Sequence, residues 1–503
     1  MIRRSSEWAT SPVAVPAARS APQSLRNRSA RGLAPACGLA RPAGKDETAA
    51  ALMAAGKTSG ASKPVKDITR GRAKRVLKVG ELATSVGSSY VWQALRWPFR
   101  SAGKRQQALL DTHIKNAVKV VERSKELRGA FMKLAQMLSM RDDIFPPEAL
   151  QVLSVVQSSV PPMDYALIRK QIIHELGRPP EELFASFDQE AFAAASLGQV
   201  HKARLKTGEE VVVKVQYPGV EETVKQDLQN MKALLATFTL IGRDVMRQKI
   251  DRSDVYRELE ERLHEEIDYV NEAKSIALFQ KMFRDDDEVI IPDVYPDMSS
   301  RRVLTMGLVE GYPISTILGA GVEQSLKDWV ALKYFRVVWR QIFEFGVLHT
   351  DPHPGNYLVT YHPKLAVLDF GSIRIFPERI RKAYHRLAAA ILARDEGTMA
   401  ECFVRLDFLD PGDNPAPLVR IMYVLFEPVL HDRPYDTRDF NLVEKGMEIA
   451  AIGIENRLFK EPGHRVFLVR AFLGLDAYLK QSGTVINWHR EFKRCVERVP
   501  DGR

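Results

Sequence analysis

The segment between Gly346 and Ser372 restricts the architecture of this 503-residue chain more than any other part of it. It reads GVLHTDPHPGNYLVTYHPKLAVLDFGS and contains a His-x-Asp triplet, then an asparagine, then an Asp-Phe-Gly triplet after a short apolar run. That order is typical of the catalytic loop and the magnesium loop of a protein kinase. A protein of this kind needs a nucleotide-binding half upstream of the segment.

The chemistry of phosphoryl transfer gives each of these polar residues a candidate role. One carboxylate must hold the attacking hydroxyl or water, and an amide plus a second carboxylate must hold the metal ion on the nucleotide phosphates. Asp351 fits the first role, and Asn356 and Asp369 fit the second as ligands of Mg²⁺. Each triplet is short enough to arise by chance, but the strand pattern at 365–368 between them favours the kinase interpretation. The insert at 352–355 departs from an ordinary protein kinase.

The upstream half is indicated by a lysine inside an apolar run. Residues 211–215 read VVVKV, which predicts a buried strand that carries Lys214. Such a lysine must find an anion, because an unpaired buried ammonium group is costly. In kinases its partners are the nucleotide phosphates and a helix glutamate. Thr207 and Gly208 predict a turn back to a preceding strand at 198–203.

The glycine-rich loop that usually opens this hairpin is missing. In its place stand Ala193, Ala194, Ala195, Ser196, Leu197 and Gly198. Alanine lets backbone amides approach phosphate but lacks the positive-φ freedom of glycine. Taken alone, such a stretch is more typical of helix or core. Its position ahead of Lys214 favours a phosphate-binding loop.

The glutamate partner of Lys214 should come from the next helix. Residues 253–277 have apolar positions at helical spacing and an acidic opposite face, which is often simply a solvated surface. Glu266 is the chosen partner, although the spacing does not separate it from Glu265 or Glu272.

A strand at 303–306 is then expected to enter a hinge at 307–311. Met306, at the end of that strand, is included among the expected nucleotide-binding residues.

On these residues the chain resembles the UbiB/AarF/ADCK family of atypical kinase-like proteins, which is associated with ubiquinone and other prenyl-lipid metabolism. The resemblance runs from Gly80 into the C-terminal region. It is carried by AAASLGQVH at 193–201, VKVQYPGV at 213–220, the Glu266-Ile267-Asp268 motif followed by Glu272, HTDPHPGN at 349–356, and a Lys-x-Ala-Gln element at 133–136.

The resemblance implies a role for the helix predicted at 104–140. This helix would lie over the active site, with Lys133 pairing with acids of the Glu266-Ile267-Asp268 motif and Gln136 facing the nucleotide. A lid of this kind would exclude a protein substrate, which favours ATP hydrolysis or a small-molecule substrate. The family usually has glycine where this chain has Ala135, so a methyl group is added at a tight helix crossing.

The expected fold class is α+β: a bilobal protein-kinase-like fold, with a small β-rich N-lobe, a helical C-lobe and an N-terminal helical extension. The expected regions are a tail at 1–63, the extension at 64–162, the N-lobe at 163–311 and the C-lobe at 312–503. Five C-lobe helices are predicted, at 384–392, 399–406, 418–430, 442–454 and 466–479. Few residues separate Gly371 from these helices, and no Ala-Pro-Glu element follows, so little platform exists for a peptide substrate.

Composition limits the other function classes. The three cysteines, Cys37, Cys402 and Cys495, are scattered and suggest neither a disulfide framework nor a zinc site. No apolar run is long enough to span a membrane.

The formal net charge of +10 is concentrated toward the N-terminus. Residues 1–44 are rich in arginine, alanine and serine and resemble a mitochondrial or plastid transit peptide. The alternatives are a species-specific tail or a wrongly assigned start, with Met53 as a later start. Residues 64–105 interleave basic and aromatic residues, which favours packing on the kinase body or contact with an anionic membrane surface. No nucleic-acid motif accompanies them, and no nucleic-acid partner is expected.

The sequence therefore predicts a protein that binds ATP or ADP with Mg²⁺ and acts as an ATPase or small-molecule kinase. The resemblance implies prenyl-lipid or quinone precursors and lipid-biosynthesis enzymes as partners. A bacterial source would place it in the cytoplasm or peripherally on the membrane, and a eukaryotic source in a mitochondrion or plastid. A nucleotide-switched pseudokinase scaffold and a true protein kinase are the alternatives.

Overall fold

The computed structural model describes residues 163–195, 197–225, 228–229, 260–261, 263–319, 321–350, 354–440, 442–456 and 463–499, with scattered helical residues between 81 and 119. These residues divide into two compact units. The strand unit comprises the described residues up to Lys274 together with 293–308. The helical unit comprises 275–292 and 309–499. Each unit is described by itself.

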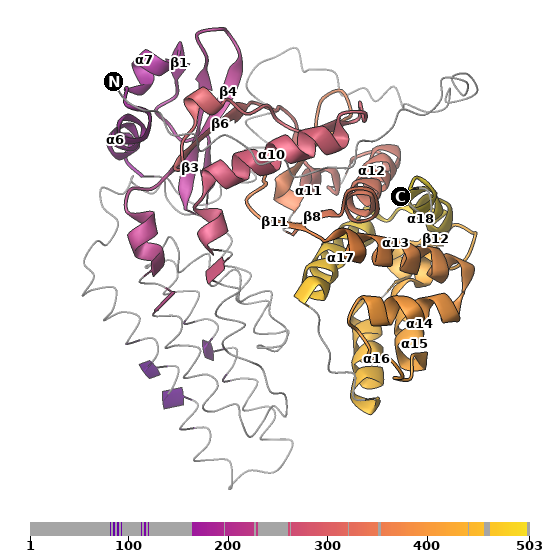
Figure 1. Ribbon diagram of the computed structural model, residues 1–503. Coiled ribbons are helices and arrows are strands. Elements are labelled where there is room, and N and C mark those ends of the chain that lie inside the picture. The colour runs from indigo at the N-terminus through magenta and orange to yellow at the C-terminus, as the bar shows by residue number, and fades with distance from the viewer. Residues whose placement is uncertain are drawn as a thin grey trace. The chain divides into compact units, whose positions relative to one another are not determined.

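The strand unit is built on an antiparallel sheet in the order β1-β3-β4-β6, with β2 pairing with β3 (Figure 1). Its strands are β1 (Ser186–Phe187), β2 (Ala193–Ala195), β3 (Gly198–Arg204), β4 (Glu210–Gln216) and β6 (Val303–Gly307). Helices α6 (Tyr165–Leu176) and α7 (Pro180–Leu183) precede the sheet.

The predicted hairpin and its strands are confirmed. β3 and β4 pair antiparallel in full register, from Gly198 opposite Gln216 to Arg204 opposite Glu210. Gly208 turns the chain between them with a φ of +107°, a conformation that glycine adopts without steric cost. The β-branched side chains that predicted the strand form its core, because Val211, Val213 and Val215 are fully buried.

The single helix expected at 253–277 is wrong, because the chain breaks at Ile267 and Asp268. The described residues from 260 to 266 are helical, and α10 (Tyr269–Phe283) begins anew after the break. The Asp268 carboxylate causes the restart, since it accepts hydrogen bonds from the backbone N–H groups of Val270 and Asn271, both at 3.1 Å. An aspartate in this position satisfies the free donors of a helix start. From Ser275 onward α10 belongs to the helical unit.

The helical unit contains three small sheets. The first has the order β5-β10-β9-β7, the second pairs β11 with β8, and the third pairs β12 with β13. The strands are β5 (Val289–Ile290), β7 (Tyr312–Pro313), β8 (Val347–His349), β9 (Tyr357–Val359), β10 (Leu365–Val367), β11 (Ile373–Ile375), β12 (Tyr435–Asp436) and β13 (Val485–Ile486). Because β5 pairs with β10, residues 275–292 group with this unit, although the sequence placed them in the N-lobe.

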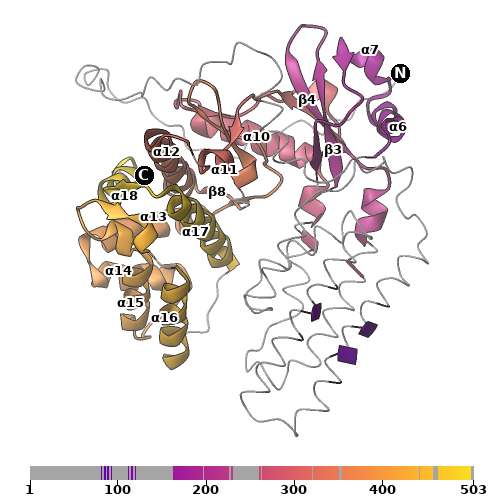
Figure 2. The same cartoon turned by 180° about the vertical axis from the view of Figure 1, so that it is seen from behind.

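The helices of this unit are labelled in Figure 2, where α14, α15 and α16 lie side by side as they do in Figure 1. The helices are α11 (Ile314–Ile317), α12 (Gln324–Arg340), α13 (Glu378–Ala393), α14 (Glu396–Arg405), α15 (Ala416–Leu425), α16 (Leu442–Glu455), α17 (Gly463–Ser482) and α18 (Trp488–Glu497), of which α18 is the most C-terminal. The five predicted helices are present. The one expected at 418–430 ends at Leu425, and a 3₁₀ turn (Glu427–Val429) follows it because Pro428 cannot continue the helix.

Helices α12 and α18 were not predicted. The signal for α18 was available, because Trp488, Phe492, Cys495 and Val496 recur at helical spacing and are buried. Asn487 caps the helix by accepting a hydrogen bond from the N–H group of Arg490 at 3.0 Å. A short helix of this kind is easily overlooked where charged residues outnumber apolar ones.

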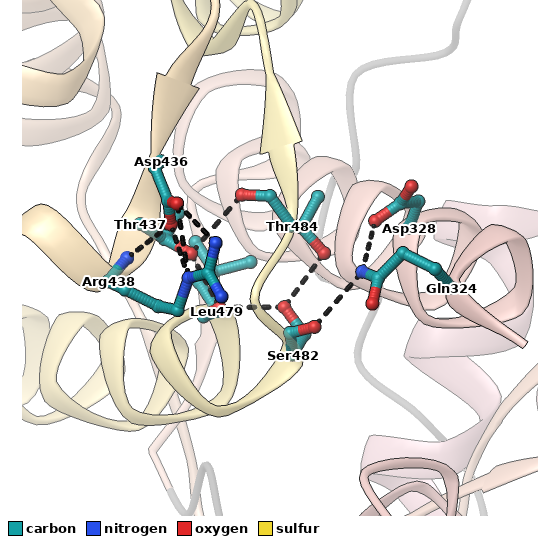
Figure 3. A network of polar contacts seen from close by, with 8 residues as sticks. All are labelled: Gln324, Asp328, Asp436, Thr437, Arg438, Leu479, Ser482 and Thr484. Atoms are coloured by element: carbon teal, nitrogen blue, oxygen red, sulfur yellow. Dashed lines mark hydrogen bonds and ion pairs between the residues drawn. The ribbon is translucent and has the colours of Figure 1, made fainter. Parts of the chain in front are cut away.

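A buried polar network joins α17 to its neighbours (Figure 3). The hydroxyls of Thr437 and Ser482 both donate to the backbone oxygen of Leu479, each at 2.7 Å. The Ser482 hydroxyl also bonds to that of Thr484 at 2.8 Å, and the Gln324 amide of α12 donates to the Ser482 carbonyl at 3.1 Å. These bonds satisfy the carbonyl groups that a helix leaves unpaired at its C-terminal end.

The described part of the expected extension is helical. Thr112, Lys115, Asn116 and Lys119 lie within the helix predicted at 104–140. The amide of Asn116 donates to the hydroxyl of Ser89 at 2.8 Å, which joins two helical stretches. Among the described residues, no helix is long and apolar enough to cross a membrane.

Candidate functional site

In the strand unit, the site is organised by an ion pair between Lys214 and Glu272. The Lys214 ammonium lies 2.9 Å from each carboxylate oxygen of Glu272. The Glu272 side chain is only 2 % exposed and that of Lys214 is 15 % exposed. The Tyr269 ring lies beneath the ammonium, 5.0 Å away. The predicted requirement for an anion is therefore met, because burying either charge without its partner would be costly.

The choice of Glu266 as the partner of Lys214 is corrected to Glu272, one of the two alternatives that the spacing left open. The helix break explains the difference. Asp268 restarts the helix, and Glu272 lies in the first turn of α10, where it reaches the lysine strand. A continuous helix would have fixed the positions of Glu266 and Glu272 relative to each other. The break at Ile267 and Asp268 removes that relation. The implied pairing of Glu266 with Lys133 remains a prediction.

The alanine loop forms a strand rather than an irregular loop. Ala193, Ala194 and Ala195 pair antiparallel with Val200, Gln199 and Gly198, respectively. Gly198 is needed for packing, since a Cβ atom there would lie 2.3 Å from the carbonyl oxygen of Val215. Ser196 lies outside the described residues.

Met306 lies on β6 and its side chain is buried. Its backbone pairs with Val212 of β4 on one side and forms a bridge with Val294 on the other. The strand expected at 303–306 is therefore present, and its end is held on both sides.

In the helical unit, His349 connects strand β8 to the Asp-Phe-Gly triplet. Its ring Nε2 bonds to the backbone oxygen of Asp369, an acceptor, so that this ring nitrogen carries the proton. The His349 backbone N–H donates to the side-chain oxygen of Gln341 at 2.7 Å. Gln341 begins a π-helical turn (Gln341–Phe345) that follows α12, a feature often found at functional sites.

A cluster of aromatic rings surrounds this connection. Phe279 of α10 packs edge to face on Phe370, with ring centroids 5.0 Å apart, and both rings are fully buried. The His349 ring lies 6.3 Å from Phe279 and 6.1 Å from both Phe370 and Tyr357. Such contacts stabilise a pair beyond the area that it buries.

The two expected magnesium ligands lie at the ends of paired strands. β9 and β10 pair antiparallel, with Tyr357 opposite Val367. Just beyond this pair, the backbone oxygen of Asn356 accepts a hydrogen bond from the N–H group of Leu368 at 2.9 Å, immediately before Asp369. One Asp369 carboxylate oxygen accepts from the Gly371 N–H group at 2.9 Å. An amide and a carboxylate fit Mg²⁺, which binds oxygen and completes its shell with phosphates and water.

Asp351, the expected residue for the attacking oxygen, lies outside the described residues, as do Lys133 and Gln136 of the expected lid. These three assignments stay predictions. Within the described ranges, no group of three or more histidine, cysteine, aspartate or glutamate side chains could hold a metal ion.

The residues after Gly371 are hydrogen-bonded to strand β8 and to the residues at its two ends. Thr350 is fully buried, and its hydroxyl lies 2.6 Å from that of Ser372. The Thr350 N–H group donates to the Ser372 carbonyl at 3.0 Å, and the Phe376 N–H group donates to the Gly346 carbonyl at 2.7 Å. Between these bonds β11 pairs with β8. The prediction that few residues separate Gly371 from the next helix is confirmed, because α13 begins at Glu378.

Sequence reasoning missed Gln341, Thr350 and Ser372. The threonine between the histidine and the aspartate of the triplet was a usable signal, because it directly follows the strand Val347–His349 and is itself fully buried. Gln341 gave no signal, since its role depends on a turn of π-helix that no local pattern predicts.

Comparison with known proteins places these observations in a family context. Residues 155–403 match the family model described as the ABC1 atypical kinase-like domain. The chain is 35% identical, over 63% of its length and 44% of the relative, to the protein ACTIVITY OF BC1 COMPLEX KINASE 3, chloroplastic, of Arabidopsis thaliana. It is 28% identical, over 84% of each protein, to the atypical kinase COQ8, mitochondrial, of Saccharomyces cerevisiae.

The chain spans about half the length of the first curated relatives that it matches. Among solved structures, it is similar to that of Rv3197 from Mycobacterium tuberculosis in complex with erythromycin. The TM-score is 0.54 and the identity 23%, and the match covers 78% of this chain and 97% of the other. This similarity supports a kinase-like fold that contains both helices and sheets.

Proposed function

This chain belongs to the UbiB/AarF/ADCK family of atypical kinase-like proteins, which carry the ABC1 domain, and from that premise we propose that it binds ATP or ADP with Mg²⁺ and acts as an ATPase or small-molecule kinase. The buried pair of Lys214 and Glu272 carries the proposal. A lysine on a central strand, paired with a carboxylate from a helix, is the arrangement that kinases use to bind nucleotide phosphates.

Each side chain has a role in the proposed reaction. Lys214 binds the α- and β-phosphates, and Glu272 fixes the position of its ammonium group. The amides of the alanine strand 193–195 lie beside those phosphates. Asn356 and Asp369 hold Mg²⁺, which neutralises charge on the phosphates when bound. Asp351 orients the attacking oxygen.

The proposed acceptor is water or a small molecule rather than a protein. Support comes from the hydrogen bonds that join residues 372–376 to residues 346–350, because they leave no free segment in that stretch on which a peptide could lie. Thr350 occupies the position where protein kinases have an arginine, and its side chain is buried against Ser372. The alternatives of a pseudokinase scaffold and a true protein kinase are not preferred.

The metabolic context is also a proposal. The COQ8 relative is named as mitochondrial and the Arabidopsis relative as chloroplastic. We infer a role in ubiquinone or other prenyl-lipid metabolism, with lipid or quinone precursors and lipid-biosynthesis enzymes as partners. The basic aromatic segment 64–105 is the proposed membrane-contacting part.

The test measures magnesium-dependent binding of ATP and ADP, and phosphate release, by the purified full chain. Phosphate release is measured with and without vesicles or a quinone-like phenol, beside an assay for phosphorylated protein. The Asp369→Asn variant should lose magnesium-dependent binding. Asp297→Asn, which makes the same change at an exposed aspartate, should behave like the parent.

Three outcomes would contradict the proposal. Equal nucleotide turnover by Asp369→Asn and the parent would refute the magnesium site. Nucleotide binding without any phosphate release, with or without the phenol, would favour the pseudokinase scaffold. Incorporation of phosphate into protein at the rate of nucleotide consumption would favour a true protein kinase.

A further inference from the structure

Three buried residues on the strand unit form a hydrogen-bonded clamp that the proposed reaction does not use directly. Gln199 and His201 lie on β3 and are 1 % and 0 % exposed, and Met163 is the first residue of the continuously described chain. The Met163 N–H group donates to the Gln199 side-chain oxygen at 2.9 Å, and the Gln199 amide nitrogen lies 3.5 Å from the Met163 carbonyl. The side chain of Gln199 thus holds the backbone of Met163 on both sides.

The same amide nitrogen contacts His201, and this contact fixes the protons of the clamp. Nδ1 of His201 lies 2.8 Å from the backbone oxygen of Asp188, which can only accept, so Nδ1 carries the proton. Nε2 is then an acceptor for the Gln199 amide, 2.9 Å away. The clamp is complete only with a neutral imidazole ring. With a proton on Nε2, this nitrogen and the Gln199 amide nitrogen would be two donors facing each other. Rotating the amide by 180° would instead place its N–H groups against the Met163 N–H group, which is also a donor.

The clamp lies directly behind the alanine strand. The backbone of Gln199 is paired with Ala194, the middle residue of β2, and the next residue, Val200, is paired with both Ala193 and Lys214. Side chains alternate along a strand, so Gln199 points to the face opposite that of Lys214. Holding Met163 therefore fixes β3 where it pairs with the residues proposed to lie beside the phosphates.

We propose that Gln199 is a positioning residue for the alanine strand, and that protonation of His201 releases the clamp and weakens binding of magnesium nucleotides. This inference rests on the proposed nucleotide site. It connects Met163, just ahead of α6, to the strand pair at 193–200. Because the clamp needs neutral His201, nucleotide affinity should fall as the pH falls below about 6.5, the ordinary pKa of histidine.

The groups around His201 favour this pH range. Burial lowers the pKa of His201, and the hydrogen bond and charge of Asp188 oppose that effect without reversing it. The phenol of Tyr165, whose ring lies 6.3 Å away, has its pKa raised by burial and by Glu181. The pKa of Glu181 is lowered by its hydrogen bond from Arg169. Neither Tyr165 nor Glu181 therefore changes its charge between pH 5.5 and 7.5. His201 takes up its proton when the clamp opens, because opening removes the burial that lowers its pKa.

The test uses two variants of the full chain between pH 5.5 and 7.5. Gln199→Glu keeps the acceptor for Met163 and places a carboxylate oxygen beside Nε2, so that the clamp now requires protonated His201. Its nucleotide affinity should fall as the pH rises, the reverse of the parent. His201→Gln keeps an acceptor near the position of Nε2 but does not titrate, and its affinity should not vary with pH. The expected change across the range is about tenfold, the effect of one buried hydrogen bond.

Gln216→Leu is the matched control, because it removes a buried hydrogen bond without adding a group that titrates. Gln216 is a buried glutamine on the adjacent strand, and its amide donates to the Ile267 carbonyl at 2.7 Å with no histidine beside it. Its affinity should be lower, with the pH profile of the parent unchanged in direction. If the pH profile of Gln199→Glu ran parallel to those of the parent and of Gln216→Leu, Gln199 would be a purely structural residue and the proposal would be overturned.

Backbone hydrogen exchange separates this proposal from the proposed function. Exchange of the peptide that contains residues 193–200, corrected for the intrinsic effect of pH, should show opposite pH trends in the parent and in Gln199→Glu without any nucleotide present. Opposite trends in a protein that binds no nucleotide would refute the proposed function and leave the clamp. A parent that binds nucleotide, with the same exchange trend in both proteins, would refute the clamp alone.

Discussion

The ammonium group of Lys214 on strand β4 contacts both carboxylate oxygens of Glu272 on helix α10 at the same distance of 2.9 Å, and neither side chain is freely exposed to water. Replacing the carboxylate removes the countercharge and leaves the lysine partly buried. Glu272→Gln should therefore destabilise the fold by about 3 kcal/mol and weaken nucleotide binding at least tenfold. Glu266→Gln is the comparison. It leaves the pair of Lys214 and Glu272 in place, so it should lower the free energy of unfolding less than Glu272→Gln does. A larger loss in Glu266→Gln than in Glu272→Gln, in denaturant unfolding and nucleotide titration, would refute the assigned partner.

Glycine is required at position 198 because of the carbonyl oxygen that lies behind it. Gly198→Ala would force a Cβ atom to within 2.3 Å of the Val215 oxygen, and the backbone of two paired strands would have to move. We expect a loss of about 3 kcal/mol, the upper end of the usual range for overpacking, in the free energy of unfolding. Gly446→Ala is the control, since a Cβ atom on α16 at that position meets nothing within 4 Å. It should stabilise the protein by about 0.5–1 kcal/mol, because alanine is the better helix former. Equal effects of the two substitutions would contradict the close approach.

The paired hydroxyls of Thr350 and Ser372 should contribute jointly to stability and activity. Thr350→Val keeps the shape of the side chain and removes the hydroxyl, and Ser372→Ala removes its partner. Each should cost about 1 kcal/mol, and the double variant should cost less than the sum, because both single changes break the same bond. The cycle is measured by chemical denaturation, with Ser325→Ala on the exposed start of α12 as a surface control. Strict additivity would mean that the hydroxyls do not interact.

One pH effect on stability should come from α17. Burial raises the pKa of Asp476 to about 6. The folded protein therefore holds this proton to a higher pH than the unfolded chain, whose aspartates titrate near 4, and the stability from Asp476 is lost as the pH rises from about 4 to about 6. Asp476→Asn should raise the melting temperature at pH 7 and leave it nearly unchanged at pH 4. Asp287→Asn, an exposed substitution, should show no such difference. A gain for Asp476→Asn that is the same at both pH values would contradict the raised pKa.

Much of the strand unit follows from local pattern. Three segments were predictable because the signal lies within each segment itself. They are the apolar run around Lys214, the Thr207-Gly208 turn and the apolar run at 303–306. The partner of Lys214 was harder to predict. The prediction assumed one continuous helix. The break at Asp268 depends on hydrogen bonds that the spacing of apolar residues does not encode.

The helical unit shows a second limit. Its helices were found from their apolar spacing, but the contacts that connect them to the site join residues far apart in the chain. The bond between Thr350 and Ser372 and the contact of Phe279 with Phe370 both arise only after the chain has folded. The tautomer of His201 depends on the backbone oxygen of Asp188 as an acceptor and on the Gln199 amide as a donor, and it has no counterpart in the sequence pattern.

The hydrogen bonds between residues 346–350 and 372–376 bear on how this protein could be inhibited. A small molecule that occupied the space of the Phe370 ring would have to expel the ring and with it the Asp369 carbonyl that His349 holds. The strand pair that follows would have to separate as well. Compounds of that type should bind weakly and slowly, whereas compounds that leave Phe370 in place meet no such barrier. Selective chemistry against this protein is therefore better directed at the surroundings of Lys214 than at the space behind the Asp-Phe-Gly triplet.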